Sequence, residues 1–148
     1  HFVFTSISEN TSIKVQIIDY IETDFGANYE PRILFESDAT VSDGNLTEPN
    51  KFSEPVSTLV TGDGTNFIFV VDRSKDSFYQ FTVTGLEGVK PPTGAASAKY
   101  QLASFGGKGT GLSQFNKPTA VAYKNRIVRI CDAGNQRVLR FKLTTDFQ

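Results

Sequence analysis

The chain has 148 residues, 39% of them hydrophobic and 21% charged, which is enough for one domain with a buried core. No apolar run approaches the roughly 18 residues of a membrane-spanning helix, so no membrane span is expected. The single cysteine, Cys131, excludes an internal disulfide, and the only histidine, His1, excludes catalytic triads and related imidazole chemistry within these residues. The net charge of −1 is the sum of two oppositely charged halves. Residues 1–74 carry 12 acidic and 4 basic side chains, whereas residues 75–148 carry 4 acidic and 11 basic side chains.

The N-terminal part of the sequence predicts short strands. His1–Ile7 and Ser12–Ile21 are expected to form a hairpin, because apolar and polar residues alternate in the second segment and Glu9-Asn10-Thr11 separates the two. Arg32–Ser37 predicts a further strand. No helical period of useful length occurs anywhere in the chain.

An internal repeat follows. Phe52-Ser53-Glu54-Pro55 recurs as Phe115-Asn116-Lys117-Pro118, and later segments of the two copies also correspond. The copies differ in length at one place, where Thr61–Asn66 is replaced by Lys124-Asn125. Gly, Asp and Asn residues there indicate a hairpin turn, which can vary in length without disturbing its strands.

Each copy of the repeat predicts three strands. The first strand follows a proline, which is tolerated at the first position of a strand. The second strand, Phe67–Val71 in the first copy, is continuously apolar and is therefore expected to be covered on both faces. Asp72 and Asp132 open equivalent turns, where the carboxylate can accept a backbone N–H bond two residues on.

A fourth strand is expected upstream of each copy, at Arg32–Ser37 and at Lys99–Ser104. The fold is thus predicted to be all-β and built from four-stranded antiparallel sheets. The sequence divides into a partial unit (1–31), a unit (32–82), an inserted loop (83–98) and a second unit (99–148).

Three motifs in the second unit, Phe105–Gly111, Gln114–Pro118 and Ile130–Val138, are similar to those of NHL-repeat β-propellers, especially bacterial secreted or surface-attached ones. The resemblance implies that each unit is a propeller blade. A propeller closes a ring of typically four to eight blades, whereas this sequence supplies two full blades and part of a third. We therefore expect a partial propeller, completed by the rest of a longer protein or by other subunits, and located in the periplasm, outside the cell or at its surface.

The repeated residues are interpreted as structural, because a residue that recurs at one turn position serves the repeat. Cys131 aligns with Val71 in an apolar strand and is expected to be buried. Gly106–Gly111 has the composition of a phosphate-binding loop, but a strand follows it instead of a helix, so we interpret it as a connection between blades. The structural repeat positions are Phe52, Pro55, Asp72, Phe115, Pro118, Asp132 and Asn135.

The basic C-terminal half predicts a binding surface. Some NHL-family propellers bind RNA through a basic face, and Tyr123 and Phe141 could provide stacking faces for bases. The other interpretation is that acidic and basic blades attract one another across the ring or across a subunit contact. The basic candidates are Lys108, Lys117, Arg126, Arg129, Arg137 and Arg140.

Four acidic residues, Asp38, Asp43, Asp63 and Glu54, carry the oxygen ligands that calcium prefers. Their spacing does not match the calcium-binding loop, and solvated turn residues are the favoured interpretation. No cofactor is therefore expected.

The leading functional hypothesis is a non-catalytic binding or scaffolding module. Its inter-strand loops, such as Asp38–Lys51 and Val83–Ala98, would meet a protein, peptide or glycan partner. Two alternatives stay open: a calcium-dependent propeller hydrolase or lactonase, and RNA binding through the basic half.

Overall fold

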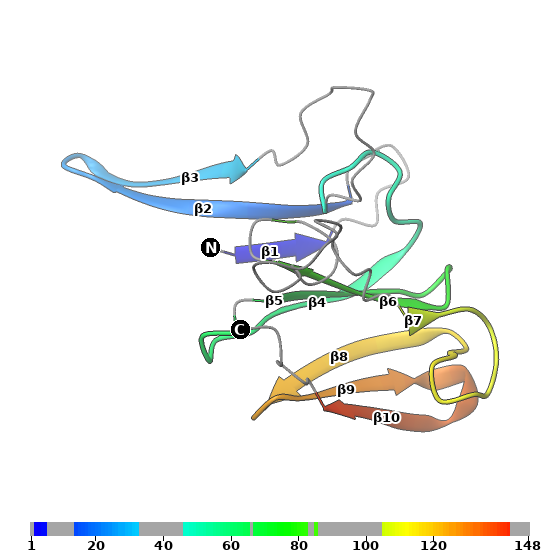
Figure 1. Cartoon of the computed structure of the whole chain (residues 1–148). Helices are drawn as coiled ribbons and strands as arrows, with labels where there is room; N and C mark the ends of the chain where they lie inside the picture. Colours follow the sequence, from blue (N-terminus) through cyan, green and yellow to red (C-terminus); the bar gives the residue numbers. More distant parts are fainter. Residues whose placement is uncertain are drawn as a thin grey trace, which may run out of the picture.

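The computed structural model describes residues 2–5, 14–32, 46–65, 67–82, 85 and 105–142 (Figure 1). Their regular elements are strands and one 3₁₀ turn, arranged in three antiparallel sheets, so the expected all-β class is confirmed. Within these ranges no helix has the length and apolar character needed to cross a bilayer. The elements are β1 (Phe2–Thr5), β2 (Val15–Thr23), β3 (Gly26–Arg32), β4 (Pro55–Val60), β5 (Phe67–Asp72), β6 (Ser77–Thr82), β7 (Phe105–Gly106), β8 (Pro118–Lys124), β9 (Ile127–Asp132), η1 (Ala133–Asn135) and β10 (Arg137–Lys142).

The N-terminal sheet has the strand order β1-β2-β3. The antiparallel pairing of β1 with β2 confirms that the two predicted strands are neighbours, while the turn expected at residues 9–11 lies outside the described residues. The sequence does not predict β3, since GANYEPR lacks β-branched residues; it becomes a strand because it pairs with β2 along its whole length. Arg32 ends β3, and residues 33–37 of the strand expected there lie outside the described residues.

The central sheet has the order β4-β5-β6-β7. Its first strand begins at Pro55, as expected for a proline in a strand. β7 pairs with the start of β6, so Phe105 and Gly106 belong to this sheet although the sequence-based division places them in the next unit. Residues 99–104 and, apart from Gly85, the expected insertion 83–98 lie outside the described residues.

The C-terminal sheet has the order β10-β9-β8 and repeats the design of the central sheet. Each first strand has an irregular register directly after its proline, at Pro118 as at Pro55. The turn between β8 and β9 places Asn125 and Arg126 at positive φ (51° and 61°), the geometry of a tight two-residue hairpin. The strand pairing continues to the turn in both sheets, which confirms that the length difference is confined to the turn.

The three sheets stack face to face, with β1 beside β4 and β4 beside β8 (Figure 1). β5 is buried on both faces, as its apolar sequence predicts: Ile68 and Val70 join one core and Phe69 and Val71 the other. The core toward the N-terminal sheet also contains Val15, Ile17, Leu46, Phe52 and Phe81. The core toward the C-terminal sheet also contains Phe78, Phe115, Val128 and Ile130.

Cys131 is exposed, so the expectation that it is buried like Val71 is wrong. In β9 the burial alternates, with Val128 and Ile130 in the core while Arg129 and Cys131 face away from it. The aligned strands differ in their surroundings: β5 lies between two sheets, whereas in the described part of the chain β9 is covered by one.

Candidate functional site

Two aspartates at equivalent positions organise one end of the sheets. Asp72 ends β5 and Asp132 ends β9, and both are fully buried. The Asp72 carboxylate accepts hydrogen bonds from the backbone N–H groups of Ser53 (2.6 Å), Glu54 (3.1 Å) and Lys75 (3.1 Å). It therefore ties the segment before β4 to the end of β5, which supports a structural role for the repeated aspartate.

Asp132 makes the corresponding link in the C-terminal sheet. It accepts hydrogen bonds from the Asn116 backbone N–H (2.6 Å), the Asn135 amide (2.8 Å) and the Arg137 Nε (2.8 Å). Burial by itself raises the pKa of Asp132, but these three donors outweigh it and hold the pKa below its usual value. The expected bond to the backbone two residues on is not made: Asp72 bonds three residues on, and Asp132 does not cap η1.

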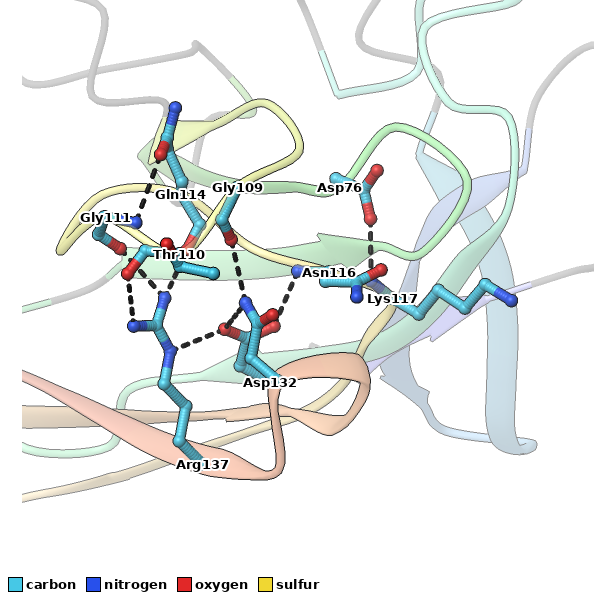
Figure 2. A network of polar contacts seen from close by, with 10 residues as sticks. Asp76, Gly109, Thr110, Gly111, Gln114, Asn116, Lys117, Asp132 and Arg137 are labelled. Carbon is cyan, nitrogen blue, oxygen red and sulfur yellow. Dashed lines mark hydrogen bonds and ion pairs between the residues drawn. The ribbon is translucent and has the colours of Figure 1, made fainter.

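The loop between β7 and β8 is fixed by side chains of the β9–β10 turn (Figure 2). Its carbonyl oxygens face these donors, whereas a phosphate-binding loop directs N–H groups at its anion. The arrangement agrees with the interpretation of Gly106–Gly111 as a connection. Hydrogen bonds of 2.6–2.9 Å run from Asn135 and Arg137 to the carbonyl groups of Gly109, Thr110, Gly111 and Gln114.

A polar pocket of about 400 Å³ lies at the same end, between the central and C-terminal sheets. Its walls come from the segment before β4, the β5–β6 turn and the loop before β8. We call it the end pocket, and it is lined by Glu54, Arg73, Ser74, Asp76, Lys108, Asn116 and Lys117.

The acidic groups of the end pocket are held by their neighbours. One Glu54 oxygen accepts from Arg73 and the other from Ser74 (2.8 Å), and these bonds lower the pKa of Glu54 from 4.5 to about 2. The Asp76 carboxylate accepts the Lys117 backbone N–H at 2.6 Å, a contact that joins the two sheets (Figure 2). Glu54 is therefore ionised at neutral pH, with its charge balanced by Arg73.

The two lysines of the end pocket differ from its acidic groups in their hydrogen bonding. Lys108 and Lys117 are exposed, and within the described ranges neither ammonium makes a hydrogen bond or an ion pair. The lining carries three cations and two carboxylates, so one positive charge remains, and the donors available to a ligand are mainly these two ammonium groups. Ammonium groups form charge-assisted hydrogen bonds with carboxylates, so the pocket is chemically suited to an anionic group.

The structure separates the six basic residues that the sequence groups together. Only two of them share the end pocket, one pair lies on the face of the C-terminal sheet that points away from the core, and the remaining two stand apart. Lys108 and Lys117 are in the pocket, Arg129 and Arg140 are paired across β9 and β10, Arg126 is in the β8–β9 turn, and Arg137 is bound to Asp132.

Tyr123 and Phe141 do not accompany these cations. Both are half-buried and pack against the core between the central and C-terminal sheets. The Tyr123 hydroxyl donates to Asp63, and this bond is the main reason that the pKa of Asp63 lies below its usual value.

The four acidic residues considered for calcium do not converge where they can be placed. Glu54 precedes β4 and Asp63 follows it, at opposite ends of the strand, while Asp38 and Asp43 lie outside the described residues. Among the residues that the structure places, no three His, Cys, Asp or Glu side chains gather as a metal site would require.

Four residues of the end pocket are not predicted as functional from the sequence, namely Arg73, Ser74, Asp76 and Asn116. A signal for two of them exists: Arg73-Ser74 follows the repeated aspartate where the second copy has Ala133-Gly134. Charged and polar residues at a non-repeated place in a repeated turn indicate a local function.

Comparison of the sequence with protein-family models and with curated proteins finds no match. A functional proposal therefore depends on the internal repeat and on the geometry of the end pocket.

Proposed function

We propose that this chain is part of an NHL-type β-propeller and acts as a non-catalytic binding module. Three observations support the assignment of its sheets as blades. Successive sheets stack face to face, their first strands β1, β4 and β8 follow one another side by side, and Asp72 and Asp132 make corresponding bonds. Radially repeated sheets in a propeller have these relations.

The partner binds at the end pocket through carboxylate groups. The observation that carries this proposal is the pair of exposed lysines, Lys108 and Lys117, in a pocket whose Glu54 is neutralised by Arg73. A carboxylate between the two ammonium groups would gain hydrogen bonds of about 1.5–3 kcal/mol each before the costs of ordering. One carboxylate gives weak binding, so the partner carries several, as an acidic peptide or a uronic-acid glycan does.

One of the loops expected to bind a partner ends near this pocket. Lys75, in the turn that supplies Arg73 and Asp76, donates to the Lys51 carbonyl at 2.7 Å. The described end of Asp38–Lys51 is thus held to the same turn as the pocket, whereas Val83–Ala98, apart from Gly85, lies outside the described residues.

Fluorescence anisotropy tests the proposal with two labelled probes, a glutamate decapeptide and a galacturonate hexasaccharide. Decaglutamine and maltohexaose serve as their uncharged counterparts. At least one acidic probe is expected to bind and its counterpart not to bind, and the stronger acidic probe identifies the partner as peptide or glycan. The double substitution Lys108→Ala/Lys117→Ala is expected to weaken binding by at least about tenfold.

Arg126→Ala is the matched control, because Arg126 is an exposed cation in the β8–β9 turn, beyond the opposite end of β8. It is expected to leave the affinity within about twofold of wild type. Equal binding of charged and uncharged probes, equal losses in the two variants, or no binding by either acidic probe would overturn the proposal.

A further inference from the structure

The C-terminal sheet presents a cationic face to solvent. We call it the outer face; its side chains alternate with those that point into the core. It carries four cations and no acidic residue, and within the described ranges none of these cations makes a hydrogen bond or ion pair. The outer face consists of Ala120, Ala122, Lys124, Ile127, Arg129, Cys131, Val138, Arg140 and Lys142.

Two arginines stand directly opposite each other on the outer face. Arg129 pairs with Arg140 across β9 and β10, and like charges in this position destabilise a sheet. Among the residues that the structure places, no acidic side chain relieves this unfavourable pair, which favours relief by another surface.

The central sheet shows what the equivalent face does elsewhere in the molecule. Phe69, Val71 and Phe78 lie at the positions that correspond to Arg129, Cys131 and Val138, and the C-terminal sheet buries them. The outer face keeps the shape of a docking face but replaces a fully buried phenylalanine by an arginine. It is therefore suited to an acidic partner surface with some apolar character, and less to another apolar sheet.

An acidic surface of this kind exists on the same chain. The hairpin formed by β2 and β3 extends beyond the rest of the fold (Figure 1), and its residues from Tyr20 to Glu30 are exposed. Tyr20 and Tyr29 are 43% and 59% exposed and contact each other, with ring centroids 5.4 Å apart, and Glu22 lies beside them. Residues 15–31 contain four acidic side chains and no Lys or Arg: Asp19, Glu22, Asp24 and Glu30. Glu22 shares the face of the two tyrosines, whereas Asp19 and Glu30 are paired on the opposite face of the hairpin.

We propose that the β2–β3 hairpin of one copy docks on the outer face of a second copy. Glu22 faces the Arg129–Arg140 pair, and the exposed rings of Tyr20 and Tyr29 lie against the guanidinium groups. Arginine and tyrosine are the residues that most often dominate such interfaces.

The contact must join two copies, because within one copy the N-terminal and C-terminal sheets cover opposite faces of the central sheet. Hairpin and outer face are different surfaces, so the association is head to tail.

A single-stranded nucleic acid fits the outer face less well, because it stacks on aromatic side chains and this face has none. The proposal does not depend on the end pocket.

Sedimentation velocity tests this association over a range of protein concentrations. At about 0.01 M salt, where the screening length is about 30 Å, wild type is expected to self-associate; at about 1 M salt, where it is about 3 Å, association is expected to disappear. Arg129→Glu/Arg140→Glu and Glu22→Lys are each expected to weaken association by more than about tenfold. Circular dichroism checks that both variants keep the wild-type fold.

Mixing the two variants provides the decisive control. The acidic outer face of the first variant is then complementary to the basic hairpin of the second, so association is expected to return in the mixture. A wild type that stays monomeric at low salt, variants that associate as wild type does, or a mixture that stays monomeric would overturn the proposal. Salt-sensitive binding of a uridine oligonucleotide that is lost in Arg129→Glu/Arg140→Glu, without self-association, would assign the face to RNA instead and overturn it as well.

Discussion

Strands β5 and β9 occupy equivalent places in the internal repeat, yet their side chains have different neighbours. In β5 every residue from Ile68 to Asp72 is buried, because a sheet lies on each side. In β9 only alternate residues are buried, and Arg129 stands where Phe69 is fully buried in the other copy. Similarity between the repeats therefore determines the path of the chain, whereas the covering of each face depends on what lies next to it.

Truncation of the two aligned side chains, Phe69 and Arg129, is expected to have very different consequences for stability. Phe69→Ala removes a ring that is stacked on Phe78 in the core, and we expect a loss of about 3–5 kcal/mol in the free energy of unfolding. Arg129→Ala is expected to change this free energy by less than about 0.5 kcal/mol, since it removes an exposed side chain and a like-charge pair. Urea unfolding measures both, and equal losses would contradict the difference between the two strands.

A smaller effect is expected from Asp132→Asn, which removes the charge that Arg137 pairs with. We expect a loss of about 2–3 kcal/mol at pH 7, because a buried ion pair is broken. The pKa of folded Asp132 lies below the unfolded value of 3.8, so its contribution is complete above that value and is lost as the pH falls below it.

Urea unfolding of wild type and variant at pH 7 and at pH 3 checks this prediction. The difference between the two proteins is expected to be smaller at pH 3. Asp24→Asn, at an exposed position of the β2–β3 hairpin, is the control and should change little at either pH. A difference that stays constant with pH would show that the ionised form of Asp132 is not the stabilising one.

The smallest effect on stability is expected at Cys131. Cys131→Ser should change the free energy of unfolding by less than about 0.5 kcal/mol, because the side chain is exposed. The thiol of native wild type should react with Ellman's reagent as fast as that of the urea-unfolded chain. In the variant Val71→Cys/Cys131→Ser the new thiol lies in the core and should react only when the protein opens; equally fast reaction of both thiols would contradict the burial of β5 on two faces.

Much of this fold could be predicted because short stretches of the sequence determine it. The prolines that begin β4 and β8, the apolar run of β5 and the length difference in the turn between the first two strands each have a direct physical meaning. β3 could not be predicted in the same way, because its strand conformation depends on pairing with β2 and not on its own propensities. The exposure of Cys131 has a signal that alignment with Val71 conceals, since Arg129, two residues earlier on the same face, is charged.

The end pocket could be predicted only in part. The basic character of Lys108 and Lys117 is visible in the sequence, but their position beside Arg73 depends on where the loop before β8 returns. That position is set by tertiary contacts, such as the bond from Lys117 to Asp76 across 41 residues. Side-chain contacts over such separations leave no periodic trace in a single sequence.

The aspartate links also bear on how the chain folds. Asp72 binds the backbone 19 residues earlier, and Asp132 binds it 16 residues earlier, so each link closes a short loop within its own repeat. Short loops cost little closure entropy, and local contacts favour rapid folding. We therefore expect each repeat to form its aspartate link early and its neighbour to assemble on it afterwards, in the manner of a linear array.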